Sequence, residues 1–284
     1  MLLEYIKKIK DIISIKEWLD DLRYAKRDGL RSTAKRVMSV LNAHEIPVTR
    51  IPQTFPEFGF KFSDFNTLDS IINILKPEFL ERLSEHFFIN REWLDTGWGE
   101  IQSPYERGYD LESLYNLIAN YQDNDTTTII AHFVVEDDVK FVPVADHGTF
   151  ENLMIILEHK TKLSDKEEFE YSRYQPLYFG YWHYYKTRMM IKSLSLLFFQ
   201  SQSVITQKGY FIKQLKEDRL QKQFAVRILN NILRGSWHPD DYIFCNGKSA
   251  QEKDPADAKE MQEYLKRENL YDDIKNLRTS KFLD

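Results

Sequence analysis

The stretch from Pro77 to Gly97 constrains the fold of this chain most strongly, because it predicts two short helices that meet at a corner. Pro77 suits the first turn of a helix, where a backbone N–H has no helical partner. Apolar residues then recur at helical spacing and form one face: Phe79, Leu80, Leu83 and Phe87. Asn90 is a favourable N-cap for a second helix, which Gly97 is expected to end. Trp93 and Leu94 are its expected buried anchors.

The second helix and the residues around it resemble part of a known family. Residues 89–101 read Ile-Asn-Arg-Glu-Trp-Leu-Asp-Thr-Gly-Trp-Gly-Glu-Ile. Together with the preceding helix, which has the form Leu-x-x-Leu-x-x-x-Phe from Leu80 to Phe87, this sequence resembles the closing two helices of the Cro/C1-type helix-turn-helix domain of phage repressors and their bacterial relatives. The match is close here and looser over the rest of the N-terminal part. The resemblance implies an all-α DNA-binding domain, a double-stranded DNA partner and a homodimer.

The position of Trp93 also predicts a DNA-binding surface by analogy with that family. Counting back from Trp93 by the family's usual interval places the recognition helix near Lys61 to Asp69, with Ser63 as its N-cap. The preceding first helix is expected to be capped by Ser32-Thr33 and to run to about His44. Asn, Gln, Ser and Thr side chains can contact base edges, and Lys and Arg can contact phosphate. The residues expected to contact DNA are Arg50, Gln53, Lys61, Ser63, Asn66 and Thr67.

Two features depart from that family. Pro52 and Pro56 restrict the second helix to a short piece, because proline has no backbone N–H to donate. Asp64 and Asp69 would repel a DNA backbone unless one of them caps the recognition helix. The sequence is therefore compatible with DNA binding and does not require it.

Basic and acidic residues are distributed unevenly along the chain. The whole chain carries 39 basic and 44 acidic residues, a net charge of −5, whereas Leu22–Phe62 contains eight basic residues against three acidic ones. A polyanion would therefore have to bind this segment. The single cysteine, Cys245, excludes an intramolecular disulfide and favours the cytoplasm. No secretion signal or membrane-spanning run is predicted.

The predicted fold class is α+β and mostly helical. Residues 1–102 are expected to form an N-terminal all-α domain with a helix-turn-helix core at about 31–100, and residues 103–110 a linker. Residues 111–284 are expected to form a C-terminal α+β domain for effector binding or dimerisation. Its small antiparallel sheet would comprise Thr126–Val135 and Lys140–Val144. Helices are predicted over Leu3–Ala25, Phe150–Lys160, Asp165–Gln200 and Lys208–Leu233.

An aromatic run at residues 174–188 could bind a planar ligand or form a dimer interface, because one helix has too many rings here for one buried face. The residues proposed for that role are Tyr181, Trp182, Tyr185, Lys186 and Arg188. The alternative is an aromatic-rich core helix with snorkelling cations, which the pattern favours.

The sequence contains no His-x-x-x-His, no His-Glu-x-x-His and no Gly-x-Ser-x-Gly motif. No metal, no cofactor and no enzymatic activity are therefore expected. The leading hypothesis is a DNA-binding transcriptional regulator with a C-terminal part that senses a small molecule or protein effector, dimerises, or both. The alternative is a protein-interaction or antitoxin-like module whose degenerate helix-turn-helix no longer reads DNA. A third, weaker hypothesis is an enzyme that binds nucleotides on the aromatic run.

Overall fold

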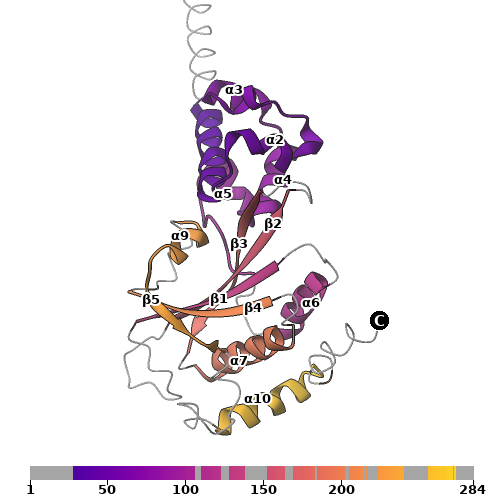
Figure 1. Ribbon diagram of the computed structural model, residues 1–284, viewed down its shortest axis with the longest axis vertical. Coiled ribbons are helices and arrows are strands. Elements are labelled where there is room, and N and C mark those ends of the chain that lie inside the picture. The colour runs from indigo at the N-terminus through magenta and orange to yellow at the C-terminus, as the bar shows by residue number, and fades with distance from the viewer. Residues whose placement is uncertain are drawn as a thin grey trace, which may run out of the picture. The chain divides into compact units, whose positions relative to one another are not determined.

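The computed structural model combines helices with a sheet, as the sequence predicts (Figure 1). It describes residues 28–105, 110–122, 128–137, 152–163, 169–182, 184–201, 205–213, 215, 223–239, 255–270 and 272. The chain divides into two compact units. The N-terminal unit comprises the chain up to Glu85 together with Asn90–Gly99, and the C-terminal unit comprises His86–Ile89 together with the chain from Glu100 onward. The predicted helix over Leu3–Ala25 and the predicted strand over Lys140–Val144 lie outside the described residues.

The regular elements of the N-terminal unit are helical throughout its described residues. The chain is helical over residues 28–43. The elements that follow are the 3-10 helix η1 (Val48–Arg50), α2 (Ile51–Thr54), η2 (Pro56–Phe58), η3 (Phe62–Phe65), α3 (Leu68–Ile74), α4 (Pro77–Phe87) and α5 (Arg91–Thr96). Figure 1 draws these elements in indigo and purple.

Phe79, in the first turns of α4, is the centre of the core of this unit. Its side chain is fully buried. Its ring centroid lies 4.8 Å from that of Phe60 and 5.4 Å from that of Phe58, both in edge-to-face geometry. Phe55 and Phe65 make further edge contacts with the same ring, at 5.6 and 6.5 Å. The apolar face predicted for this helix therefore gathers phenylalanines from the irregular segment between α2 and α3.

The corner between α4 and α5 follows the prediction in most respects. Pro77 begins α4, and Asn90 occupies the N-cap position of α5, although its side chain makes no capping hydrogen bond. Gly97 ends α5 with a φ of +81°, a left-handed conformation that favours glycine, and its N–H donates to the carbonyl of Trp93 at 2.8 Å. Leu94 is fully buried, whereas Trp93 is only half-buried, so the prediction of a buried Trp93 is wrong.

The predicted recognition helix at Lys61–Asp69 is not formed. Its place is taken by η3, a single 3-10 turn that contains Ser63, followed by an extended Thr67. Thr67 is the N-cap of α3: its Oγ1 accepts from the N–H of Ser70, and the Ser70 hydroxyl accepts from the N–H of Thr67, both at 3.1 Å. This reciprocal capping box fixes the start of α3 at Leu68, and Ser63 caps nothing.

The predicted capping role of Ser32-Thr33 is also wrong, because the chain is already helical at residue 28. The Thr33 hydroxyl instead donates to the carbonyls of Gly29 and Asp95, both at 3.2 Å. A Thr side chain within a helix commonly donates to the carbonyl one turn earlier, so its presence alone did not mark a helix start.

The C-terminal unit contains a five-stranded mixed sheet in the order β3-β2-β1-β4-β5. Its strands are β1 (Thr128–Glu136), β2 (Asn152–Lys162), β3 (Glu170–Tyr181), β4 (Ile205–Ile212) and β5 (Ile232–Trp237). β1 pairs with β4 in parallel, and the other neighbours are antiparallel. The described helices are α6 (Leu111–Gln122), α7 (Tyr185–Gln200), α9 (Ala225–Leu229) and α10 (Pro255–Arg267).

This sheet is larger than predicted and is not purely antiparallel. The strand predicted at Thr126–Val135 is β1, but its antiparallel partner is β2, where a helix was predicted. β3 and β4 likewise replace the first part of one predicted helix and the start of another. Residues 153–157 of β2 are all fully buried, because both faces of the sheet are covered at that point. A strand buried on both faces shows no alternation of apolar and polar residues, so it is easily read as a helix.

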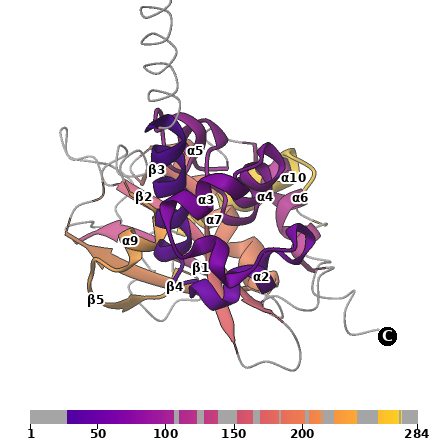
Figure 2. The same cartoon turned by 90° about the horizontal axis from the view of Figure 1, so that it is seen from above.

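The two faces of the sheet carry separate apolar cores. One core joins Phe133, Ile155 and the other residues of that face to α6, α7 and α10. The smaller core joins Val134, Met154 and Ile212 to α9, which leads into β5 in both views (Figures 1 and 2). The same face also carries polar side chains, among them His132, Glu158 and Ser172.

Candidate functional site

The six residues predicted to contact DNA lie on two neighbouring segments of the N-terminal unit. η1 packs against η3, which brings Arg50 and the segment after Lys61 into one region. We call this surface the η1–η3 edge; it comprises Arg50, Gln53, Lys61, Ser63, Asn66 and Thr67. Arg50 is half-buried and donates from Nη1 to Oε1 of Gln53 at 2.8 Å, and the other five residues are exposed. The region also holds Phe62, with 56% of its side chain exposed.

Both acidic residues near this edge have partners within the N-terminal unit. Oδ2 of Asp64 accepts the N–H of Lys61 at 2.8 Å, so this carboxylate caps η3. Oδ1 of Asp69 lies 3.1 Å from Nη2 of Arg31 in an exposed ion pair. These contacts reduce the repulsion that the two acids would exert on a polyanion. At Asp64 the reduction comes from the capping hydrogen bond, and at Asp69 it comes from the neighbouring positive charge.

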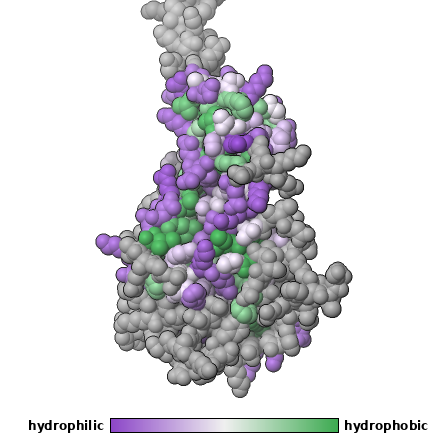
Figure 3. Space-filling view, in the orientation of Figure 1, coloured by the Kyte–Doolittle hydropathy of each residue, from purple (hydrophilic) through white to green (hydrophobic). Residues whose placement is uncertain are grey.

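Several other cations of this unit also have structural partners. Arg82 pairs with Glu57 at 3.0 Å, and Arg91 pairs with Glu81 at 2.7 Å and with Asp95 at 2.9 Å. Exposed pairs of this kind contribute little stability, but they lower the net positive charge available to an anion. Figure 3 shows hydrophilic and apolar residues interspersed over the visible face of this unit.

Arg36 holds the end of α5 to the helix over residues 28–43. Its Nε donates to the carbonyl of Leu94 at 2.8 Å, and its Nη2 donates to the carbonyl of Asp95 at 2.6 Å. Burial lowers the pKa of Arg36, while the charge of Asp95 acts in the opposite direction. A cation at these carbonyls also interacts favourably with the negative end of the helix dipole. Arg36 is thus a structural residue of the N-terminal unit.

We expect Arg36→Gln to destabilise the N-terminal unit by about 2 kcal/mol, because charge-assisted hydrogen bonds to the last carbonyls of α5 would be lost. The neighbouring Lys35 is exposed, so Lys35→Gln is the matched control and should change the melting temperature very little. Thermal unfolding of the full chain measures both variants. Equal melting temperatures for the two variants would contradict the structural role of Arg36.

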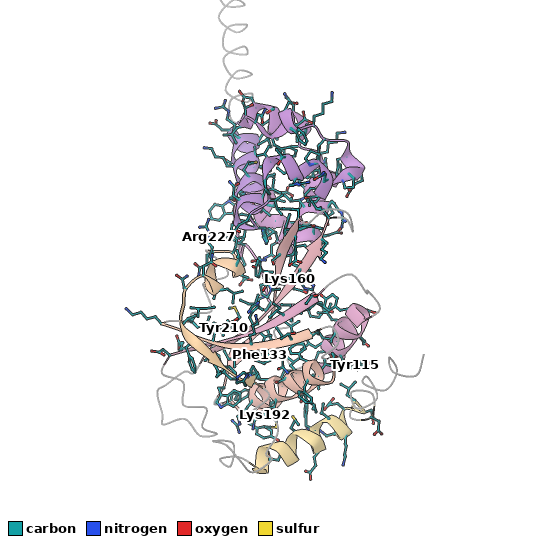
Figure 4. All side chains as sticks on the ribbon, in the orientation of Figure 1. Tyr115, Phe133, Lys160, Lys192, Tyr210 and Arg227 are labelled. Carbon is teal, nitrogen blue, oxygen red and sulfur yellow. The ribbon has the colours of Figure 1, made fainter. Side chains whose placement is uncertain are left out.

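The aromatic run spans the end of β3 and the start of α7, so it does not form a single helix as predicted. Trp182 and Arg188 are buried, Tyr181 is half-buried, and Tyr185 and Lys186 are exposed. Nη1 of Arg188 donates to the carbonyl of Trp182 at 3.4 Å. Nζ of Lys192, labelled on α7 in Figure 4, lies 6.0 Å from the centroid of the Trp182 ring. The structure therefore divides these residues between the core and the surface.

A polar cluster lies on the second face of the sheet, and no sequence motif predicts it. Nε2 of His132 lies 2.8 Å from Oε2 of Glu158, and the Ser172 hydroxyl donates to Oε1 of the same carboxylate at 2.6 Å. The ring of Tyr210 stacks on His132 with centroids 5.5 Å apart. Figure 4 labels Tyr210 on β4 and Lys160 on β2 near this cluster. Only the pairing of four strands brings these residues together, which is why no sequence motif marks them.

The electrostatics of this cluster stabilise an ionised Glu158. Burial alone would raise the pKa of Glu158, but hydrogen bonds from His132 and Ser172 and the charges of His132 and Lys160 together lower it. The Ser172 hydroxyl donates to Glu158 and not to His132, so the cluster lacks the serine–histidine hydrogen bond of a nucleophilic hydrolase. The arrangement fits a polar network within the sheet.

Within the described part of the chain, no group of three or more His, Cys, Asp or Glu side chains is placed to hold a metal ion. No described helix has the length and apolar character needed to cross a membrane.

The chain matches no known protein family, and neither the curated proteins nor the solved structures contain a match. The resemblance of residues 89–101 to the Cro/C1-type domain therefore remains a prediction from the sequence.

Proposed function

We propose that the protein is a DNA-binding regulator whose N-terminal unit contacts double-stranded DNA through the η1–η3 edge. In this proposal the protein binds as a homodimer, and the C-terminal unit dimerises or senses an effector. The main support for this DNA-binding role is that Asp64 and Asp69 are paired with partners inside the unit. Lys61, Asn66 and Thr67 beside them are exposed. A surface of cations, amides and hydroxyls suits phosphate and base-edge contacts.

The DNA contact would differ from that of a standard helix-turn-helix. Since the chain forms the single turn η3 at the predicted place of a recognition helix, base contacts would come from the η3 turn and the residues before α3. Asn66 is exposed there and carries an amide that can hydrogen-bond to base edges, whereas the exposed Thr67 already uses its hydroxyl to cap α3. Arg50 and Lys61 would contact phosphates.

The proposal predicts separate effects for the two kinds of contact. Arg50→Gln and Lys61→Gln should each flatten the salt dependence of binding by about one ion, on random and selected duplexes alike. Asn66→Ala should weaken binding to a selected duplex by about 1–3 kcal/mol and leave binding to random duplexes unchanged. Fluorescence anisotropy of labelled duplexes, titrated at a series of salt concentrations, measures both effects. The selected duplex is obtained by repeated rounds of binding from a random pool.

Lys213→Gln is the matched control, because Lys213 is an exposed lysine of the C-terminal unit. The control should bind as the parent does. Absence of binding at low salt, or an equal loss in Lys213→Gln and Lys61→Gln, would overturn the proposal.

A protein-interaction module is the second candidate, and two exposed aromatic side chains favour it. Phe62 is 56% exposed, and Trp98, between Gly97 and Gly99, is 77% exposed. Exposed aromatic residues are common anchors of protein interfaces. Failure of DNA binding, together with weaker association of a co-purifying protein after Trp98→Ala or Phe62→Ala, would favour this candidate.

A further inference from the structure

The segment His86–Ile89 belongs to the C-terminal unit and carries an unusual backbone conformation. Phe88 follows the last residue of α4 with a φ of +55°, a region that bulky side chains rarely adopt. Its ring lies against the imidazole of His159 on β2, with centroids 5.1 Å apart and planes inclined by 32°. The disfavoured backbone conformation and the ring contact with His159 thus occur at the same residue.

Polar contacts hold the same segment on β3. The guanidinium of Arg173 lies 5.7 Å from the centroid of the Phe88 ring, and its Nη1 donates to the carbonyl of His86 at 3.4 Å. Nε2 of His86 lies 2.8 Å from the hydroxyl of Tyr171. The segment is therefore held by the ring contacts of His86 and Phe88, by these hydrogen bonds and by the burial of Phe87 and Ile89.

Gln102 ties this segment to two further elements. Its side chain is fully buried. Nε2 donates to the carbonyls of Phe87 at 3.2 Å and Tyr174 at 2.8 Å, and Oε1 accepts the N–H of Ala225 at 2.7 Å. One amide thus joins the end of α4, β3 and the start of α9.

The imidazole of His159 is buried in surroundings that oppose its protonation. Burial is the larger cause and the positive charge of Arg173 the smaller one, and together they lower the pKa of His159 to about 3. The hydrogen bond to Gln175 raises this pKa, but by less. Oε1 of Gln175 also accepts from the hydroxyl of Tyr121 on α6, at 2.7 Å. Nε2 of His159 lies 3.2 Å from the same oxygen and therefore carries the proton of a neutral ring. The described side chains around the ring include a cation and no carboxylate that could stabilise an imidazolium.

We propose that His86–Ile89 is an acid-sensitive clasp, which opens locally when His159 takes up a proton. An imidazolium under Phe88 would be desolvated and would face Arg173, and opening of the clasp would give it access to water. The sheet core that contains Phe133 and Ile155 is apolar and extensive, so the clasp should open at a lower free energy than the whole unit unfolds. Since His86 and Phe87 are the last residues of α4, opening would release the last turn of that helix.

Thiol labelling at two buried positions tests this proposal in the full chain. In a Cys245→Ser background, Ile89→Cys reports on the clasp and Ser193→Cys reports on the core of the same unit. The reagent is 4,4′-dithiodipyridine, and each rate is divided by that of the unfolded variant at the same pH. For Ile89→Cys we expect the corrected rate to rise about tenfold per pH unit between about pH 6 and pH 4, because one proton is taken up on opening. The rate for Ser193→Cys should rise far less.

His159→Gln provides the decisive comparison, since its amide N–H₂ can still donate to Gln175 but does not titrate. The rise in Ile89→Cys labelling should disappear in this background, whereas protonation of His86 as the cause would leave it in place. A parallel rise at Ile89→Cys and Ser193→Cys would show global opening and overturn the proposal. A corrected Ile89→Cys rate that does not change with pH would overturn it equally.

Discussion

Phe79→Ala is expected to lower the unfolding free energy of the N-terminal unit by about 3–5 kcal/mol, the range for loss of a large buried aromatic side chain. Phe79 is fully buried and is the ring shared by four edge-to-face contacts, with Phe55, Phe58, Phe60 and Phe65. The substitution would leave a cavity among the phenylalanine rings that pack on Phe79. Calorimetry of the full chain, with the transition of this unit fitted separately, measures the loss.

Trp93→Ala is the control for this prediction. Trp93 is larger than Phe79 but only half-buried, so its truncation should destabilise the unit clearly less. A loss for Trp93→Ala equal to or greater than that for Phe79→Ala would place the centre of the core at the α4–α5 corner instead of at the phenylalanine cluster.

Gly209→Ala is expected to destabilise the C-terminal unit by about 2–4 kcal/mol, because the structure has no room for a methyl group at this position. Gly209 on β4 pairs with Trp237 on β5. A Cβ at residue 209 would lie 2.5 Å from both the backbone oxygen and Cδ2 of Trp237. The backbone oxygen cannot move away by a rotamer change, so the β4–β5 pairing would have to shift. Thermal unfolding followed by near-ultraviolet circular dichroism detects the change at Trp237.

The same substitution at Gly29 is the matched control. Gly29 lies within the helical residues 28–43, and a Cβ there would have no neighbour within 4 Å. Because alanine has the higher helix propensity, Gly29→Ala should be neutral or should stabilise the chain by up to about 1 kcal/mol. Destabilisation of similar size by both substitutions would mean that the close approach of Trp237 does not determine the effect at Gly209.

The sequence by itself determined those parts of the fold in which local chemistry is decisive. Three such local signals are Pro77 at the start of α4, Gly97 at the end of α5 and the apolar stripe through Phe79. Distant residues do not easily override signals of this kind. β1 was also predictable, because its β-branched residues and its flanking turn residues lie within one short segment.

Only the tertiary structure decided how the remaining segments fold. β2 is apolar on both faces because α7 and α9 cover opposite sides of the sheet, and this double burial removed the alternation that identifies a strand. The recognition helix expected at Lys61–Asp69 does not form for a related reason. The Thr67–Ser70 capping box and the burial of Phe65 against Phe79 determine where α3 starts. The clusters around His132 and His159 depend on strand register, which joins residues far apart in the sequence. Such contacts depend on which surfaces pack together in the folded chain, and a local sequence pattern does not show this.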